Sequence, residues 1–209
     1  MYNAIKDDDF LSIKNLTVEY YSGKSVVHAV NGISLKIGKG RALGLVGETG
    51  AGKTTIAKSI LRILPDVGAR IKEGEILLDG DDLLKKKEAD MRKIRGNDIS
   101  MIFQDPMTAL NPVERIGDQI CEAVRLHSDM TKEECEERAK EMLKMVGITE
   151  DRYSEFPHQF SGGMKQRIVI AIALACNPKV LLADEPTTAL DVTIQAQVLE
   201  LIADLGEKY

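Results

Sequence analysis

Residues 47 to 54 read Gly47-Glu48-Thr49-Gly50-Ala51-Gly52-Lys53-Thr54 and fit the phosphate-binding loop pattern G-x-x-x-x-G-K-[ST]. The segment before the loop, Ala42 to Val46, is apolar and predicts a buried strand, and residues 55 to 61 predict the first turns of a helix. Glycines let such a loop turn tightly, so that successive N–H groups converge on phosphate oxygens at a helix N-terminus. In this pattern Lys53 reaches the outer phosphates and Thr54 offers its hydroxyl to Mg²⁺. These flanking elements make a chance match the poorer explanation.

The chain has 209 residues, 44% hydrophobic residues and a formal net charge of −5. These values predict one large domain or two small ones, and they argue against a strongly basic nucleic-acid surface. The three cysteines have no paired spacing, so a reducing compartment fits better than a zinc or disulfide framework. The first ten residues do not resemble a signal peptide, and the longest apolar run, Ile168 to Cys176, is too short to span a bilayer. We therefore expect membrane association to depend on a partner.

The N-terminal part predicts a small antiparallel sheet. Residues 11 to 21 alternate between apolar and polar, and residues 26 to 37 are rich in β-branched side chains, interrupted by a hairpin signal at Asn31-Gly32. The helix after the phosphate loop should end near Leu64. Further short strands are expected at residues 75 to 78 and 99 to 103.

The middle of the chain, from about residue 113 to residue 148, has dense charges and apolar residues at helical spacing. It predicts a mostly helical insert. Beyond it we expect a helix from Ser161 to Cys176, a buried strand at Val180 to Ala183 and an amphipathic helix at residues 192 to 205.

Two carboxylates, Asp184 and Glu185, directly follow the strand predicted at residues 180 to 183. Ligands bind at the carboxyl ends of strands in open α/β sheets. There a first carboxylate can hold Mg²⁺ and a second can orient a water molecule. A solvated Asp-Glu turn is an equal alternative for this motif alone, but the phosphate loop upstream favours the metal and water reading.

The hexapeptide Ser161-Gly162-Gly163-Met164-Lys165-Gln166 opens a helix, with Ser161 as its expected N-cap. Two glycines allow close backbone approach, so this helix start is a second place where an anion could bind. Taken alone, the hexapeptide would more simply be an ordinary capped helix.

The string Phe160-Ser161-Gly162-Gly163-Met164-Lys165-Gln166-Arg167 resembles the signature motif of ATP-binding cassette (ABC) ATPases. The order of the motifs is also similar to that family: phosphate loop, Gln104 after a strand, signature, the Asp184-Glu185 strand, and Ala189-Leu190-Asp191. Within that family, the sequence most closely resembles the ATPase subunits of oligopeptide, dipeptide and nickel importers. The segments that show this resemblance are residues 28–32, 103–112, 156–160 and 188–197.

The resemblance implies an α/β fold: a P-loop NTPase core with a small antiparallel β subdomain and a helical insert at about 113–175, within a single domain over residues 1–209. It implies that Glu185 is the general base, that Gln104 senses the γ-phosphate and that Lys53 binds the phosphates. It implies that Mg²⁺ is held by Thr54, Gln104 and Asp184. The expected ATP-binding residues are Tyr20 (with Tyr21 as its neighbouring alternative), Gly47, Glu48, Thr49, Gly50, Ala51, Gly52, Lys53, Thr54, Thr55, Ser161, Gly162, Gly163 and Asp191.

The resemblance also implies partners. In the family a second ATPase subunit, identical or paralogous, faces the first, and Ser161, Gly162 and Gly163 would contact the γ-phosphate of the opposite subunit. Transmembrane permease subunits would hold the protein at the cytoplasmic face of the cell membrane. A solute-binding protein outside the cytoplasm would act indirectly, and no nucleic acid is expected.

The chain departs from the family pattern after Asp191, because no histidine follows that residue. The family places a switch histidine there, on a strand beside the phosphate-loop strand, so we expect a truncated chain with an unpaired apolar edge and doubtful ATPase activity on its own. Two alternatives stay open: a non-transport ABC ATPase that acts on nucleic acid, and an ATP-binding fragment that does not hydrolyse. The transported solute is not specified by the sequence.

Overall fold

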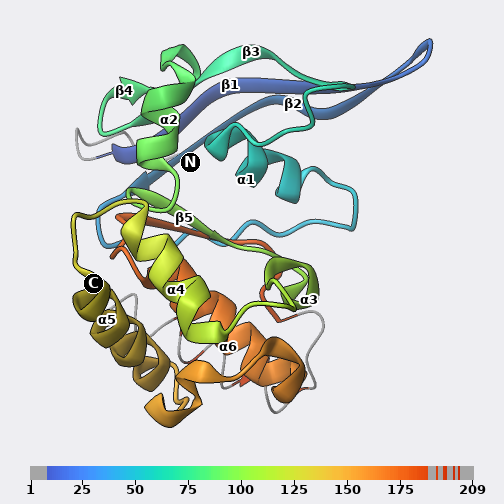
Figure 1. The fold of residues 1–209 in the computed structure, drawn as a ribbon. Coiled ribbons are helices and arrows are strands. Elements are labelled where there is room, and N and C mark those ends of the chain that lie inside the picture. Colours follow the sequence, from blue (N-terminus) through green and yellow to red (C-terminus); the bar gives the residue numbers. More distant parts are fainter. Residues whose placement is uncertain (1–8, 188–191, 193–194, 197–199, 201, 203–209) are drawn as a thin grey trace. The chain divides into compact units, whose positions relative to one another are not determined.

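The structure is a computed structural model that describes residues 9–187, 192, 195–196, 200 and 202. The chain divides into two units between Arg92 and Lys93. Each unit is described in turn, with the element labels of Figure 1.

The N-terminal unit is built on a four-stranded sheet in the order β2-β1-β3-β4. β1 (Asp9–Ser22) lies between β2 (Ser25–Gly38) and β3 (Ala69–Leu78), and it is antiparallel to both. The short β4 (Asp81–Asp82) pairs with the end of β3. The apolar side chains predicted to alternate along β1 are almost fully buried, at 0 to 1% exposed, so the antiparallel sheet is confirmed: Leu11, Ile13, Leu16 and Val18.

The hairpin that joins β1 to β2 turns at Gly23, which has a positive φ of 58°, and Ser22 pairs with Ser25 across the turn. The prediction of a hairpin at Asn31-Gly32 is therefore wrong. Those two residues form a bulge in a continuous strand, opposite Thr17, whose Oγ1 accepts a hydrogen bond from the Gly32 N–H at 3.1 Å. Glycine suits both a turn and a bulge because it tolerates positive φ, so the dipeptide alone could not distinguish them.

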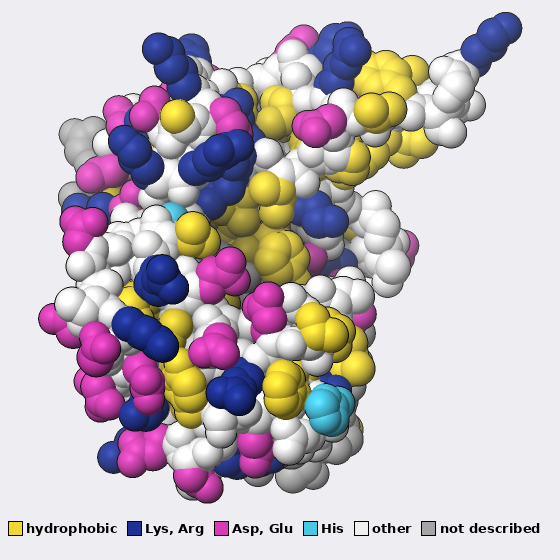
Figure 2. All heavy atoms as spheres, in the orientation of Figure 1, with side chains coloured by type: hydrophobic (Ala, Val, Ile, Leu, Met, Phe, Trp, Pro, Cys, Tyr) yellow, Lys and Arg dark blue, Asp and Glu magenta, His cyan; other side chains and the backbone are white. Residues whose placement is uncertain are grey.

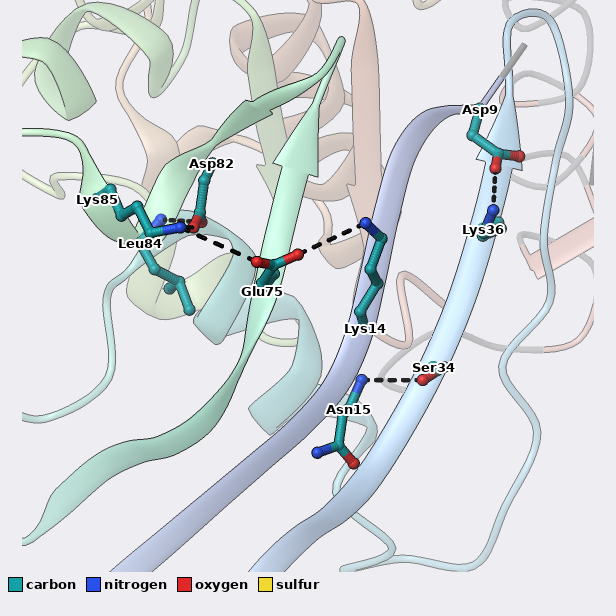
Figure 3. Close-up of polar contacts among 9 residues, drawn as sticks. All are labelled: Asp9, Lys14, Asn15, Ser34, Lys36, Glu75, Asp82, Leu84 and Lys85. Atoms are coloured by element: carbon teal, nitrogen blue, oxygen red, sulfur yellow. Dashed lines mark hydrogen bonds and ion pairs between the residues drawn. The ribbon is translucent and has the colours of Figure 1, made fainter. Parts of the chain in front are cut away.

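Polar side chains connect the strands of this sheet on the face drawn in Figure 3. Glu75 of β3 pairs with Lys14 of β1 at 3.5 Å and with Lys85 at 3.9 Å. Lys85 lies in a short 3₁₀ helix, η1 (Leu83–Lys85), and also pairs with Asp82 at 2.9 Å. At the other edge Lys36 pairs with Asp9. Exposed pairs of this kind contribute little to stability, on the order of 0–1 kcal/mol each.

The helix after the phosphate loop, α1 (Lys53–Leu61), ends three residues earlier than predicted. Arg62 adopts a left-handed conformation with φ 53° and stops it. The buried strand predicted at residues 42 to 46 is absent: Leu43, Leu45 and Val46 are 47, 44 and 99% exposed. A strand forms only where its N–H and C=O groups find a neighbouring strand, and among the described residues neither sheet includes this segment. A further helix, α2 (Glu88–Ile94), crosses the boundary between the units.

The C-terminal unit contains two parallel strands, β5 (Ile99–Ile102) and β6 (Val180–Ala183). They pair in register from Ile99 with Val180 to Ile102 with Ala183. β5 forms where a short strand was predicted and is buried along its length, whereas β6, which was predicted to be buried, is half-exposed. Within the described part of this sheet β5 is the sole partner of β6, so its other edge is not covered by a strand.

The helices described in this unit are α3 (Pro106–Ala109), α4 (Ile116–Arg125), α5 (Lys132–Met145) and α6 (Gly162–Leu174), with two 3₁₀ helices, η2 (Glu150–Ser154) and η3 (Pro157–Gln159) (Figure 1). Side chains of α4, α5 and α6 form one apolar core. A reciprocal capping box between Thr131 and Glu134 begins α5. The helical character predicted for residues 113 to 148 is confirmed, since the periodic residues of α4 and α5 form this core. The helix predicted at residues 192 to 205 lies mostly outside the described residues.

Candidate functional site

Glycine is required at two positions of the loop before α1. Gly50 and Gly52 have φ of 86° and 90°, which side chains rarely adopt. A Cβ added at Gly52 would also overlap the carbonyl oxygen of Ala29 in β2. The loop therefore packs directly against the backbone of the sheet, and this fixes where α1 begins.

Lys53, the first residue of α1, folds back over the loop. Its Nζ donates hydrogen bonds to the carbonyl oxygens of Gly47 at 2.9 Å and Glu48 at 3.1 Å. The Ala51 N–H donates to the Glu48 carbonyl at 3.1 Å, which tightens the same turn. The ammonium group therefore lies beside the loop that leads into the N-terminus of α1, an arrangement that attracts phosphate. Of the next two residues, Thr54 is half-buried and Thr55 is buried.

Two adjacent tyrosines on β1 were the candidates for stacking on a base. The Tyr21 hydroxyl donates to Glu19, and the Arg70 guanidinium lies 5.8 Å from the Tyr21 ring centre. Tyr20 is half-buried and pairs with Val27 of β2, two residues before the Ala29 carbonyl that contacts Gly52. The pairing register therefore places Tyr20 beside the part of β2 that contacts the phosphate loop. The hydroxyl and ring of Tyr21, in contrast, already contact Glu19 and Arg70.

The C-terminal unit brings three further predicted residues together at the carboxyl ends of β5 and β6. The Asp184 N–H continues the parallel pairing by donating to the Ile102 carbonyl at 3.0 Å. Two residues beyond Ile102, the Gln104 Nε2 donates to Oε2 of Glu185 at 3.0 Å. Asp184 is 7% exposed, whereas Gln104 is exposed. Glu185 has a φ of 47°, a strained conformation for a non-glycine residue that is frequent at functional sites.

The predicted N-cap of α6 is confirmed. The Ser161 Oγ accepts a hydrogen bond from the Met164 N–H at 3.4 Å, and its carbonyl accepts one from the Lys165 N–H at 2.9 Å. Ser161 and Gly162 are exposed and Gly163 is half-exposed. A Cβ added at Gly162 would meet nothing within 4 Å, so this helix start has room for a ligand.

The predicted residues therefore fall into three described sets. The phosphate loop with Tyr20 belongs to the N-terminal unit, and the strand-end residues and the start of α6 belong to the C-terminal unit. Asp191 lies outside the described residues. Sequence reasoning missed Asp105, whose side chain caps α3 next to Gln104, and Arg152, which contacts the loop before α6. The Asp105-Pro106 pair carried a capping signal, but no spacing rule identifies Arg152.

Within the described part of the chain, no group of three or more His, Cys, Asp or Glu side chains is arranged to hold a metal by itself. None of the helices in that part combines the length and the apolar character needed to cross a membrane.

Comparison with known proteins agrees with these features. The sequence model of the family described as ABC transporter matches residues 30–188. A probable peptide ABC transporter ATP-binding protein from Sinorhizobium fredii is 50% identical over all of this chain and 63% of its own length. The oligopeptide transport ATP-binding protein AppD of Bacillus subtilis is 51% identical over 95% of this chain and 61% of its own length. The chain thus spans about three-fifths of the length of each of these two relatives.

Solved structures show the same fold. A dimeric ATP-binding cassette in a post-hydrolysis state, bound to ADP and Pi, superposes with a TM-score of 0.84 at 31% identity, over 95% of this chain and 83% of that one. The protein cbiO1 from Clostridium perfringens, part of the ABC transporter complex cbiONQ, gives a TM-score of 0.78 at 26% identity, over 97% of this chain and 75% of that one. The P-loop NTPase core with an antiparallel β subdomain and a helical part is therefore the fold of this chain. On the family match and these structures, the chain belongs to the ABC transporter family, as an ATP-binding cassette.

Proposed function

We propose that this chain binds ATP with Mg²⁺ and hydrolyses it as the energy-coupling subunit of an importer for peptides or a related solute, such as nickel. The observation that carries the proposal is the 3.0 Å hydrogen bond between Gln104 and Glu185. It brings a carboxamide and a carboxylate together beside Asp184, at the strand ends where an α/β sheet binds ligands. The names of the relatives, which are peptide and oligopeptide transport ATP-binding proteins, support the solute class.

In this proposal the phosphate loop holds the nucleotide. Phosphate oxygens would take the place of the Gly47 and Glu48 carbonyls as acceptors for the Lys53 ammonium. The N–H groups of residues 48 to 55 and the N-terminus of α1 would bind the remaining oxygens. Tyr20 would stack on the adenine ring, because the hydroxyl and ring of Tyr21 are already engaged.

The residues fit a magnesium ion by the chemistry of their donors. Gln104 uses its Nε2 for Glu185, so its amide oxygen remains an oxygen ligand of the kind Mg²⁺ prefers. Asp184 offers a buried carboxylate and Thr54 a hydroxyl. When bound, the ion would neutralise negative charge on the β- and γ-phosphate oxygens.

Glu185 would act as the general base. Its carboxylate would accept a proton from the water that attacks the γ-phosphorus, while the bond from that phosphorus to the ADP oxygen breaks and phosphate leaves. Gln104, hydrogen-bonded to the same carboxylate, would hold its direction. A positioned base of this kind contributes on the order of 10²- to 10⁴-fold in rate.

In this proposal the exposed start of α6 does not contact the nucleotide that the chain's own phosphate loop binds. Ser161, Gly162 and Gly163 would instead donate to the γ-phosphate bound by a second cassette, identical or paralogous, with Asp191 communicating across that interface. Two chains in a twofold or pseudo-twofold arrangement would then enclose two nucleotides. Permease subunits would hold the pair at the cytoplasmic face of the membrane, and a solute-binding protein would act through them.

Two observations on the described residues argue against the nucleic-acid alternative. The one basic run of the sequence begins with Lys85 and Lys86, which are paired with Asp82 at 2.9 Å and with Asp81 at 2.7 Å. On the face drawn in Figure 2, basic and acidic side chains are interspersed. Nucleic-acid binding by phosphate contacts depends on a continuous basic surface.

The experiment that tests the proposal is reconstitution of the full-length protein with its permease subunits in lipid vesicles. We expect ATP turnover that rises when solute-loaded binding protein is added, and no turnover with Lys53→Ala. Stimulation by DNA or RNA in place of the binding protein would support the nucleic-acid alternative. ATP binding without turnover would support the non-hydrolysing alternative.

A further inference from the structure

Arg152, in η2, contacts several residues of the segment that leads into α6. Its guanidinium carbon lies 4.1 Å from the centre of the Phe160 ring, a cation–π geometry. One terminal nitrogen, Nη2, pairs with Glu155 at 2.6 Å and donates to the Gln159 carbonyl at 3.1 Å. The other, Nη1, lies 3.5 Å from the Met164 sulfur. One side chain thus touches residues on both sides of Ser161.

These contacts converge on the N-cap. Phe160 directly precedes Ser161 and is 5% exposed. The Met164 N–H donates a hydrogen bond to the Ser161 Oγ. Because Arg152 holds the residue before the cap and the residue three positions after it, it restrains the direction in which Ser161 to Gly163 present their N–H groups.

Two further hydrogen bonds of this segment reach neither η2 nor α6. The Gln159 side chain accepts from the Phe156 N–H at 2.7 Å, and the Phe160 N–H donates to the Pro157 carbonyl at 3.2 Å. Both bonds stay within the loop and tie it only to itself. Among the described side chains, Arg152 links this loop to both η2 and the first turn of α6.

We propose that Arg152 is a positioning residue that fixes the signature segment, and so sets how well this chain completes the nucleotide site of a second cassette. The inference rests on the function proposed above. The guanidinium suits the task because it is planar, stays charged and can stack and donate in several directions at once. A lysine at this position would keep the charge but lose the stacking and the forked donors.

The chain offers a matched control at the other end of α6. Arg138 donates to the Ala175 carbonyl at 3.1 Å and to Oδ1 of Asn177 at 2.7 Å, and it pairs with Glu141 at 3.3 Å. It therefore holds the C-terminal end of α6 with contacts like those that Arg152 makes at the N-terminal end. Arg138→Ala removes a comparable restraint from the same helix without touching the signature segment.

The test compares Arg152→Ala, Arg152→Lys and Arg138→Ala in the full-length protein, each with Glu185 intact for turnover. ATP affinity of the isolated chain by calorimetry should stay within about twofold in all three, because the phosphate loop is untouched. For Arg152→Ala, kcat should fall on the order of tenfold, since small misplacements of positioned groups are costly. Arg152→Lys should recover part of that loss, and Arg138→Ala should keep kcat near the wild-type value.

Hydrogen exchange localises the effect. Arg152→Ala should speed exchange of the amides at residues 161 to 166, and Arg138→Ala should speed exchange near residues 172 to 177 instead. Equal kcat for Arg152→Ala and wild type would overturn the inference, and so would an equal loss in Arg138→Ala. If the wild type showed neither turnover nor ATP-linked dimerisation, the proposed function would fail and this inference with it. If Ser161→Arg blocked dimerisation while Arg152→Ala changed nothing, only the role of Arg152 would be wrong.

Discussion

The side-chain amide of Gln104 donates a hydrogen bond to Oε2 of Glu185 at 3.0 Å, although 81 residues separate the two in sequence. Parallel pairing of β5 with β6 brings them together, because each residue lies just beyond the carboxyl end of its strand. Glu185 holds a left-handed φ of 47°, which costs about 1–3 kcal/mol for a residue that is not glycine. The orientation of this carboxylate is therefore a product of the fold rather than of local preference.

Replacing Glu185 with glutamine should nearly abolish ATP turnover in the full-length protein. The amide cannot accept the proton from water, and we expect a loss on the order of 10²- to 10⁴-fold with ATP still bound. Steady-state phosphate release checks the rate. Asp98→Asn is the matched control, since Asp98 is a carboxylate at the opposite ends of β5 and β6, where it pairs with Lys179 at 2.8 Å. A Glu185→Gln protein with most of its turnover would place the base elsewhere.

Replacing Lys53 with alanine should weaken ATP binding. Hydrogen bonds to charged groups contribute about 1.5–3 kcal/mol, so we expect affinity to drop about tenfold to a hundredfold. Calorimetry with ATP and Mg²⁺ measures this directly. Lys58→Ala, which removes a positive charge one and a half turns further along α1, should bind ATP nearly as well as the wild type. Unchanged affinity in Lys53→Ala would contradict the assignment of the phosphate loop.

Replacing Ser161 with arginine should block ATP-dependent association of two cassettes. A Cβ added at the neighbouring Gly162 would meet nothing within 4 Å, but a long cationic side chain at Ser161 would occupy the space in which the α6 N-terminus is proposed to meet a partner's nucleotide. In a Glu185→Gln background of the full-length protein, sedimentation should show an ATP-linked dimer that Ser161→Arg removes. ATP affinity of the isolated chain should change little. Equal dimerisation with and without the substitution would refute the trans role of this segment.

Acid should destabilise the N-terminal unit partly through Glu19. The hydrogen bond from Tyr21 lowers the pKa of this carboxyl below its ordinary value, against the opposing effect of burial and with help from Lys72. A lowered folded-state pKa means that the stabilisation is present above the unfolded-state pKa, about 4.3, and is lost as pH falls through the folded-state value. Tyr21→Phe removes the donor, so melting temperature should depend less steeply on pH below about 4.5 than in the wild type.

The same hydrogen bond raises the pKa of Tyr21, so its stabilising effect is also lost as pH rises above about 10. Thermal melts from acid to alkaline pH check both limbs. An unchanged acid limb in Tyr21→Phe would show that this hydrogen bond does not carry the effect.

Replacing Gly117 with alanine should destabilise the C-terminal unit. An added Cβ would overlap the ring of Tyr153, whose hydroxyl is held by the Cys121 sulfur at 3.2 Å and by Asp118 at 3.3 Å. Overpacking costs about 1–3 kcal/mol, which outweighs the gain of up to about 1 kcal/mol from alanine in a helix. Denaturant unfolding measures the difference. Gly44→Ala, where a Cβ meets nothing within 4 Å, should change stability by less than about 0.5 kcal/mol.

A double mutant makes the last prediction specific. If the Tyr153 ring is the cause, Tyr153→Ala should remove most of the penalty of Gly117→Ala, and a double-mutant cycle will show the coupling. Additive effects would contradict the packing explanation.

The sequence alone determined the local features with strong patterns. The burial of the apolar positions of β1, the helical periods of α4 and α5, and the N-cap at Ser161 each depend on neighbouring residues, and each is as predicted. The sequence alone did not determine which segments pair with one another or in which register. The dipeptide Asn31-Gly32 is compatible with a turn or a bulge, and only the register of β1 with β2 makes it a bulge.

Tertiary structure likewise decided that residues 42 to 46 do not form a strand and that β6 is half-exposed. Burial of an apolar strand depends on a neighbouring strand, which the strand's own sequence does not encode. It decided that Tyr21 is engaged by Glu19 and Arg70, that Arg152 reaches the segment around Ser161, and that Gln104 meets Glu185. Each of these contacts joins side chains whose positions depend on the packing of whole elements. Local propensity specifies which elements form, whereas the geometry of the site arises only when those elements are brought together.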